Sequence, residues 1–192
     1  MPIRAVLFLL AALTPALPAT AQEIEANEAL LMRLIFDDCV GFVKDGLEPF
    51  KGLETDDLNP EEREQFKELV EDGGLSIQMV ENRTYVAVWG KLENAPTCLI
   101  TPKSNQISEP LLTVRKREFI EQATLRALAE GLVVGTSETN PEYGEFRWVD
   151  YSWVGPGDET ESLKVFLSYE AKESLARIDA IFVVIPPPDA IN

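Results

Sequence analysis

The sequence predicts an α+β fold in which helices pack on antiparallel sheet. Three observations indicate this class. Segments with apolar residues at three- and four-residue spacing are separate from segments rich in β-branched and aromatic residues. The strand-like segments come in two runs, and short turns connect them within each run, as in antiparallel meanders. The predicted order is α-α-β-β-β-α-β-β-β-β, and the repeated pattern of helix followed by meander raises the hypothesis of two related halves, 22–102 and 111–186.

The first 21 residues predict a secretory signal peptide. A single positive charge precedes an apolar run over 5–13, and Ala19 and Ala21 place small residues at the positions that signal peptidase reads. The apolar run is too short for a bilayer, which needs about 20 residues, and no later run is long and apolar enough. We therefore expect no transmembrane segment. The remaining chain, 22–192, is expected to be a single α+β domain in the periplasm or outside the cell.

Export changes the interpretation of the two cysteines, Cys39 and Cys98. An even number of cysteines in an oxidising compartment predicts a disulfide between them. The bridge closes a loop of about 60 residues, which the chain-entropy model equates with about 4 kcal/mol of stability. The alternatives are a redox pair or a metal site. A redox pair usually has Cys-x-x-Cys spacing, and a thiolate metal site needs more than two ligands, so a structural bridge is favoured.

Three helices are expected, over 25–46, 59–72 and 113–130. The first has apolar residues at helical spacing, includes Cys39, and is followed by a terminating glycine, Gly46. The second begins with a capping Asn59, a first-turn proline and acidic residues that suit the helix dipole. The third has an apolar stripe that ends before Gly131.

Seven strands complete the prediction, and the last of them is almost entirely apolar, which indicates a central or well covered position. The Asn140-Pro141 pair and the glycine-rich segment 155–158 are expected to be turns. Cys98 lies in the third strand, so the disulfide would join the first helix to the sheet. The expected strands are 75–80, 84–92, 97–101, 132–136, 145–154, 163–169 and 177–185.

Composition excludes several classes of function. The chain has 33 acidic and 17 basic residues, for a net charge of -16, and nucleic-acid or anionic-membrane binding needs a basic footprint instead. It contains no histidine, which removes Ser-His-Asp and Cys-His catalytic units and histidine-ligated metals. Nucleophile-elbow and phosphate-loop motifs are absent. We therefore expect a protein that is not an enzyme and needs no cofactor.

Two acidic clusters leave a weaker hypothesis of a carboxylate- or calcium-dependent hydrolase. Oxygen-bearing side chains near residue 57 have nearly the spacing of a calcium loop: Asp57, Asn59, Glu61 and Glu68. Glu62 occupies the position where that loop needs glycine, and Pro60 starts a helix there, so a solvated helix start is favoured. The second cluster falls in a turn and is expected to be solvated: Asp158, Glu159 and Glu161.

Charge is unevenly distributed along the chain. Residues 22–82 hold 17 acids and 5 bases, residues 83–128 hold 4 acids and 7 bases, and residues 129–192 hold 12 acids and 4 bases. Three consecutive cations begin the third helix, where they oppose its dipole: Arg115, Lys116 and Arg117. Either nearby acids offset them, or they contact an anionic partner.

Aromatic residues in the strand 145–154 suggest a contact surface. Strand alternation places Trp148 on one face, and Tyr151 and Trp153 on the other. One face belongs to the core, and the other is either covered as well or free to contact a partner or ligand.

Two functional hypotheses follow. The first is an exported, acidic, non-enzymatic domain that acts through protein–protein contact, as an inhibitor or as an accessory subunit of an envelope complex. The alternative is a small-ligand or carbohydrate-binding protein that uses an aromatic sheet face.

Overall fold

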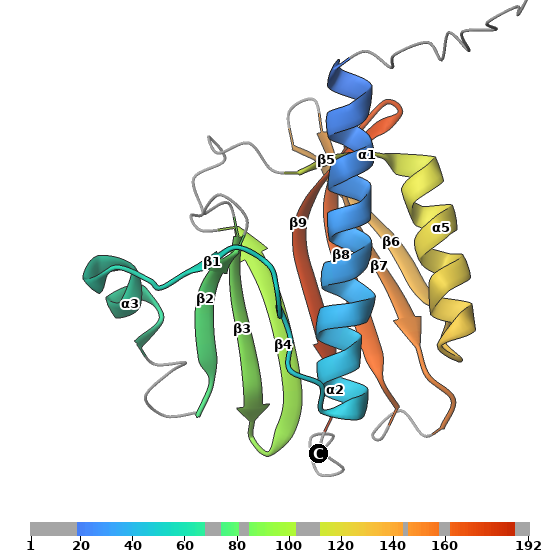
Figure 1. Cartoon of the computed structure of the whole chain (residues 1–192). Helices are drawn as coiled ribbons and strands as arrows, with labels where there is room; N and C mark the ends of the chain where they lie inside the picture. The colour runs from blue at the N-terminus through green and yellow to red at the C-terminus, as the bar shows by residue number, and fades with distance from the viewer. Residues whose placement is uncertain are drawn as a thin grey trace, which may run out of the picture.

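The computed structural model describes residues 19–67, 74–80, 85–102, 112–143, 146–157 and 162–186. These residues form helices and one nine-stranded antiparallel sheet (Figure 1). The α+β class is therefore confirmed.

The first helical segment is one continuous run of three parts: α1 (Ala19–Met32), the π-helix η1 (Arg33–Val40) and α2 (Gly41–Asp45). It begins earlier than predicted and ends at Gly46, which has the left-handed φ of 68° that favours glycine after a helix. The side chains that predicted an apolar stripe are fully buried, among them Leu31, Leu34, Ile35 and Cys39. Burial of this stripe explains why the segment is helical and where it packs.

Two further helices follow in the described part of the chain, α3 and α5. In α3 (Pro60–Gln65), the Asn59 side chain accepts a hydrogen bond from the Glu62 amide at 2.9 Å, and the Glu62 side chain accepts from the Asn59 amide at 2.8 Å. This capping box confirms the predicted helix start and gives Asn59 a structural role. Helix α5 (Lys116–Ala129) ends before Gly131, whose φ is 84°.

The strands lie in the order β1-β2-β3-β4-β9-β8-β7-β6, and β5 also pairs with β9. Strands β1 and β5 are short and were not predicted from the sequence. Strand β5 occupies the first residues of the predicted third helix, because its backbone pairs with the start of β9. The bounds are β1 Thr55–Asp56, β2 Ser76–Val80, β3 Tyr85–Leu92, β4 Ala95–Pro102, β5 Thr113–Arg115, β6 Val133–Tyr143, β7 Phe146–Val154, β8 Lys164–Lys172 and β9 Leu175–Val184.

One predicted turn lies inside a strand instead. Asn140 and Pro141 belong to β6, at the edge of the sheet, where the pairing with β7 shifts between Thr139 and Glu142. An edge strand with a bulge tolerates proline because the missing amide proton is not needed for a ladder bond.

The sheet joins two meanders, β2-β3-β4 and β6-β7-β8-β9, through the pairing of β4 with β9. Strand β4 pairs with the end of β9 and β5 with its beginning. The Tyr85 hydroxyl lies between the two pairings: it donates to the Ile178 carbonyl at 2.6 Å and accepts from the Leu112 amide at 3.1 Å. Burial raises the pKa of Tyr85, so this hydroxyl keeps its proton.

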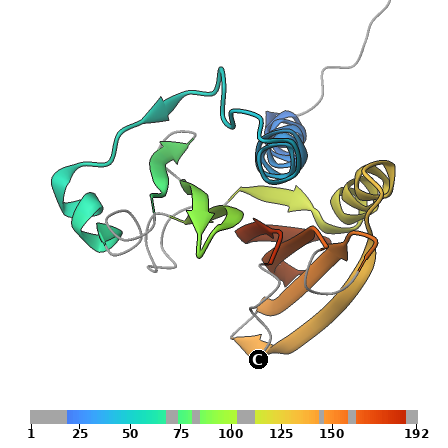
Figure 2. The same cartoon turned by 90° about the horizontal axis from the view of Figure 1, so that it is seen from below.

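The helices cover one face of the sheet, which we call the helix face. The run α1–η1–α2 lies over β4, β5 and β9, and α5 lies beside it toward β6 (Figures 1 and 2). The main core fills the space between these layers and includes Phe119, Trp153, Val165, Ile178 and Val183.

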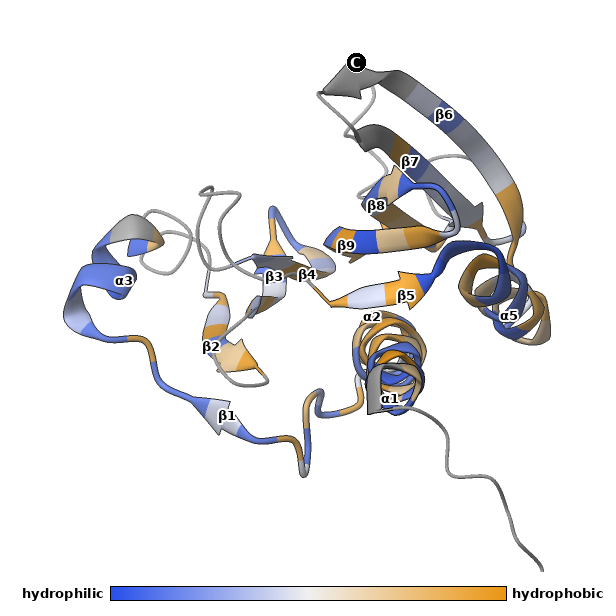
Figure 3. Cartoon of the chain, turned by 90° about the horizontal axis from the view of Figure 1, so that it is seen from above, coloured by the Kyte–Doolittle hydropathy of each residue, from blue (hydrophilic) through white to orange (hydrophobic). Residues whose placement is uncertain are grey.

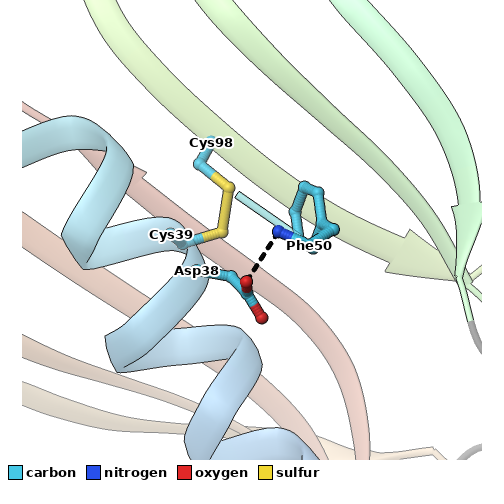
Figure 4. Close-up of a disulfide and its surroundings, with 4 residues drawn as sticks. All are labelled: Asp38, Cys39, Phe50 and Cys98. Atoms are coloured by element: carbon cyan, nitrogen blue, oxygen red, sulfur yellow. Dashed lines mark hydrogen bonds between the residues drawn. A yellow bond between two sulfur atoms is a disulfide. The ribbon is translucent and has the colours of Figure 1, made fainter. Parts of the chain in front are cut away.

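The predicted disulfide is present between Cys39 of η1 and Cys98 of β4, with the two Cα atoms 5.3 Å apart (Figure 4). Beside it, the Asp38 carboxylate accepts a hydrogen bond from the Phe50 amide at 2.6 Å and pairs with Arg33 at 3.4 Å. Burial raises the pKa of Asp38, although these two contacts oppose that shift. The bridge and the carboxylate together hold the helical layer and the following loop against the sheet.

Candidate partner-binding face

The face of the sheet opposite the helices differs between the two meanders. On β2–β4 this face carries a second apolar cluster, and the side chain of Phe66, just after α3, packs against it. The members of this cluster are buried: Leu58, Leu75, Met79, Val86 and Val88. The first meander therefore carries buried apolar side chains on both of its faces.

Within the described residues, the second meander has no such cover. In Figure 2 the helices lie to one side of β6–β9, and among the described elements no helix lies on the other side. We call this surface the open face and define it by the residues that line its central hollow or pair across its strands. They are Thr136, Glu138, Asp150, Phe166, Ser168, Ala180 and Phe182.

An apolar row crosses from the covered cluster onto the open face. Leu99, which packs against that cluster, pairs in register with Phe182, and Phe182 pairs with Phe166. The two phenyl rings stack with centroids 6.1 Å apart and planes at 24°. Phe166 remains 40% exposed. The row therefore packs against the covered cluster at Leu99, which is partly buried, and ends at an exposed side chain, Phe166.

A small hollow lies beside the stacked rings. Its volume is about 240 Å³. It is lined by parts of Thr136, Asp150, Tyr151, Phe166, Leu167, Ser168, Ala180 and Phe182. This volume is below the roughly 300–1,000 Å³ of typical ligand pockets, so the hollow suits one inserted side chain better than a whole ligand.

An acidic row runs parallel to the apolar one. Glu138, Asp150, Ser168 and Ala180 pair in register across β6, β7, β8 and β9. The Ser168 hydroxyl donates to the Asp150 carboxylate at 2.7 Å. Glu138 and Asp150 are directly opposite each other, an arrangement of like charges that destabilises a sheet.

Asp179 adds a further carboxylate next to this row. It lies at a bulge of β9, where the pairing passes from Ala180–Ser168 directly to Ile178–Tyr169. Burial, and then repulsion from Glu170 and Asp150, raise the pKa of Asp179 to about 6.

No hydrogen bond or ion pair to Asp179 is formed by the described part of the chain. The charge of Glu170, which also acts on Asp179, is compensated by an ion pair with Arg177. Asp179 is therefore a partly buried carboxylate whose charge is not compensated.

The three predicted cations occupy different settings. Arg115 binds Glu28 through its Nε at 2.9 Å, and the Arg115 amide donates to the same carboxylate. This contact raises the pKa of Arg115 and lowers that of Glu28, which is buried. Arg117 pairs with Glu121 at 2.9 Å on the exposed side of α5, and Lys116 is partly exposed. Acidic side chains thus lie beside two of the three cations, Arg115 and Arg117.

The predicted aromatic contacts lie mainly on the helix face. Trp153 is fully buried against Phe36 and donates its indole N–H to Thr124 at 3.2 Å. Tyr151 is partly buried, with its ring centroid 5.0 Å from that of Trp153. The backbone of Trp148 is in β7, and its side chain lies outside the described part of the structure.

Two other surface features are less informative. A hollow of about 750 Å³ lies between α3 and β2, but the connecting residues 68–73 are outside the described part of the chain, so we place no site there. Exposed apolar side chains also gather on α5 and the start of β6, where Figure 3 shows hydrophobic colour. They are Leu125, Leu128, Val133 and Val134.

Within the described residues, no group of three acidic or cysteine side chains is arranged to hold a metal ion. The acidic turn 158–161 and Glu68 of the calcium hypothesis lie outside those residues. None of the described helices is long and apolar enough to cross a membrane.

Sequence reasoning did not identify the open-face residues. Alternation in β8 separates Phe166 and Ser168 from the core residues Val165 and Leu167, and this signal was available. In β9 almost every residue is apolar, so the pattern did not distinguish the two faces. Comparison with known proteins adds no further guide, because no family model, curated protein or solved structure matches the chain.

Proposed function

We propose that this protein is an exported, non-catalytic binding domain that acts through contact with another protein, and that the partner binds the open face. The observation that supports this most strongly is the position of the stacked Phe166–Phe182 pair. It continues a row that begins at Leu99, which is partly buried against the covered cluster, and it ends at Phe166, which is 40% exposed. Aromatic anchors beside a small pocket are typical of the residues that dominate protein–protein binding energy.

The size and lining of the hollow favour a protein partner over the alternative of a small ligand or carbohydrate. A hollow of about 240 Å³ accepts one side chain, and the aromatic rings lie beside it. A ligand site usually surrounds most of the ligand. The fully buried Trp153 does not offer a platform for a sugar ring.

Export and the absence of catalysis belong to the same proposal. A disulfide that closes a long loop is compatible with an oxidising compartment. The sequence has no histidine and no nucleophile motif, which supports a role in binding.

Site-specific photocrosslinking in the cell of origin tests the proposal. Phe166 is replaced by a photoreactive phenylalanine analogue, and the matched control places the same analogue at Leu125, which is 68% exposed on α5. We expect a discrete protein adduct at position 166 that disappears when Phe182→Ser is added. Equal crosslinking at both positions, or an adduct insensitive to Phe182→Ser, would contradict the proposed function.

A further inference from the structure

We propose that the open face recognises a partner segment in which a lysine or arginine side chain lies next to an apolar one, and that Asp179 receives the cation. This inference rests on the proposed function, since it names the chemistry of the partner for the same face. The apolar row supplies the surface for one side chain, and the acidic row supplies the surface for the other.

The two rows lie at a spacing that one extended segment can match. Phe182 and Ala180 are two residues apart along β9, which is about 7 Å in a strand. Asp179 follows at the bulge next to Ala180. A segment that inserts an apolar side chain beside Phe166 and Phe182 therefore brings a neighbouring long cationic side chain within reach of the carboxylates.

Asp179 is the residue that gains most from such a contact. Its carboxylate is partly buried, and the negative charges of Asp150 and Glu170 act on it. The nearby cation, Arg177, is already paired with Glu170. A lysine or arginine from a partner would supply the missing counter-charge and a charge-assisted hydrogen bond.

The charges also decide between possible occupants. A second copy of this chain carries the same net charge of -16, so the acidic rows of two copies would repel each other. A metal ion would need converging ligands, and no group of three is present in the described part of the chain. A cationic and apolar protein segment satisfies both rows at once.

A binding role for Asp179 has a signature that a structural role lacks. Removing the charge should stabilise the free protein, because the ionised carboxylate is unfavourable in the folded state. The same change should weaken partner binding, because the cation loses its counter-charge. A residue kept only for stability would shift both properties in the same direction or leave binding unchanged.

The experiment selects peptides from a random twelve-residue phage-displayed library on the purified disulfide-bonded protein at neutral pH. Three variants are compared with the unmodified chain. These are Asp179→Asn, the double variant Phe166→Ser/Phe182→Ser, and a charge-matched control, Glu48→Gln, at an exposed position after the first helical run. Selected peptides are then synthesised, and their affinities are measured together with the melting temperature of each variant.

We expect selected peptides to carry lysine or arginine within two residues of an aromatic or large aliphatic residue. Asp179→Asn should weaken their binding by about tenfold, which corresponds to about 1.4 kcal/mol, because the charge-assisted hydrogen bond is lost, and it should raise the melting temperature. Glu48→Gln should change neither, and the double phenylalanine variant should abolish binding.

Each other outcome has a distinct meaning. Peptides that depend on Phe166 and Phe182 but carry no cationic preference, or bind Asp179→Asn equally well, would overturn this inference and leave the proposed function standing. Peptides that bind the double phenylalanine variant equally well would contradict the proposed function itself. Loss of melting temperature in Asp179→Asn would show that the carboxylate is structural.

Discussion

The two meanders share one sheet and one helix face, yet they differ on the opposite face. On β2–β4 that face is closed by an apolar cluster in which Met79 is 1% exposed. On β6–β9 it leaves Phe166 40% exposed, and Asp179 lies nearby as a carboxylate without a counter-charge from the described residues. The row from Leu99 to Phe182 and Phe166 crosses the boundary without a break in pairing. The difference therefore comes from what covers each half and not from the sheet itself.

The largest expected effect comes from placing the same charge on both halves of this face. Met79→Lys buries an unpaired ammonium in the covered cluster and should cost at least about 3–5 kcal/mol of unfolding free energy. Phe166→Lys leaves its charge in solvent near carboxylates and should cost about 1 kcal/mol, mainly through loss of the ring stack. Urea denaturation of both variants measures this contrast. Similar losses would show that the open face is covered in solution.

The next effect concerns the layer that both meanders share. The double variant Cys39→Ala/Cys98→Ala removes a bridge between residues 59 apart, which should lower the unfolding free energy by about 4 kcal/mol. The bridge is on the helix face, so peptide binding to the open face should persist wherever the variant is folded. Calorimetry measures the unfolding free energy of the variant, and binding titrations at low temperature measure its affinity for the peptides. Loss of binding by a folded variant would show that the two faces are coupled.

Asp179 predicts a pH dependence of stability with a defined sign. The pKa of Asp179 in the folded state is about 6, above the usual value of 3.8, so the folded protein holds this proton more tightly than the unfolded one. The contribution of Asp179 to stability is therefore lost as pH rises from about 4 to 6, and this contribution is constant above that range.

Asp179→Asn should remove this loss. We expect the variant to match the unmodified protein near pH 3.5 and to exceed it by on the order of 1–2 kcal/mol at pH 7. Thermal or urea unfolding across that range measures the difference. A constant difference at all pH values would mean that the charge of Asp179 is compensated, and the contrast between the two halves would then rest on the aromatic row alone.

The smallest effect concerns the acidic row. Ser168→Ala removes the 2.7 Å hydrogen bond to Asp150 from a partly exposed site and should cost about 1 kcal/mol or less. If the row serves recognition, the same variant should change the affinity for cationic peptides more than it changes stability. Ser76→Ala, at an exposed position of β2, is the matched control and should change neither quantity.

Sequence reasoning predicted the elements because local patterns specify them. The apolar stripe around Cys39, the capping residues Asn59 and Glu62, and the glycine at 46 each act within one or two helical turns. The disulfide followed from counting cysteines in a chain that the sequence predicts to be exported. Strands β1 and β5 were missed because short segments with little pattern become strands only through their pairing partners.

By itself, the sequence determined the acidic composition, the lack of histidine, the α+β class and the disulfide between the first helix and the sheet. Only the tertiary structure decided which faces are covered, because the same apolar residue is core or surface according to what packs on it. In β9 both faces are apolar, so Phe182 looked like any core residue until its row was seen to continue to the exposed Phe166. Asp179 likewise became notable only when the bulge placed it near Asp150 and Glu170 without a counter-charge. Contacts between distant strands set the environment of each charge, and no local pattern encodes them.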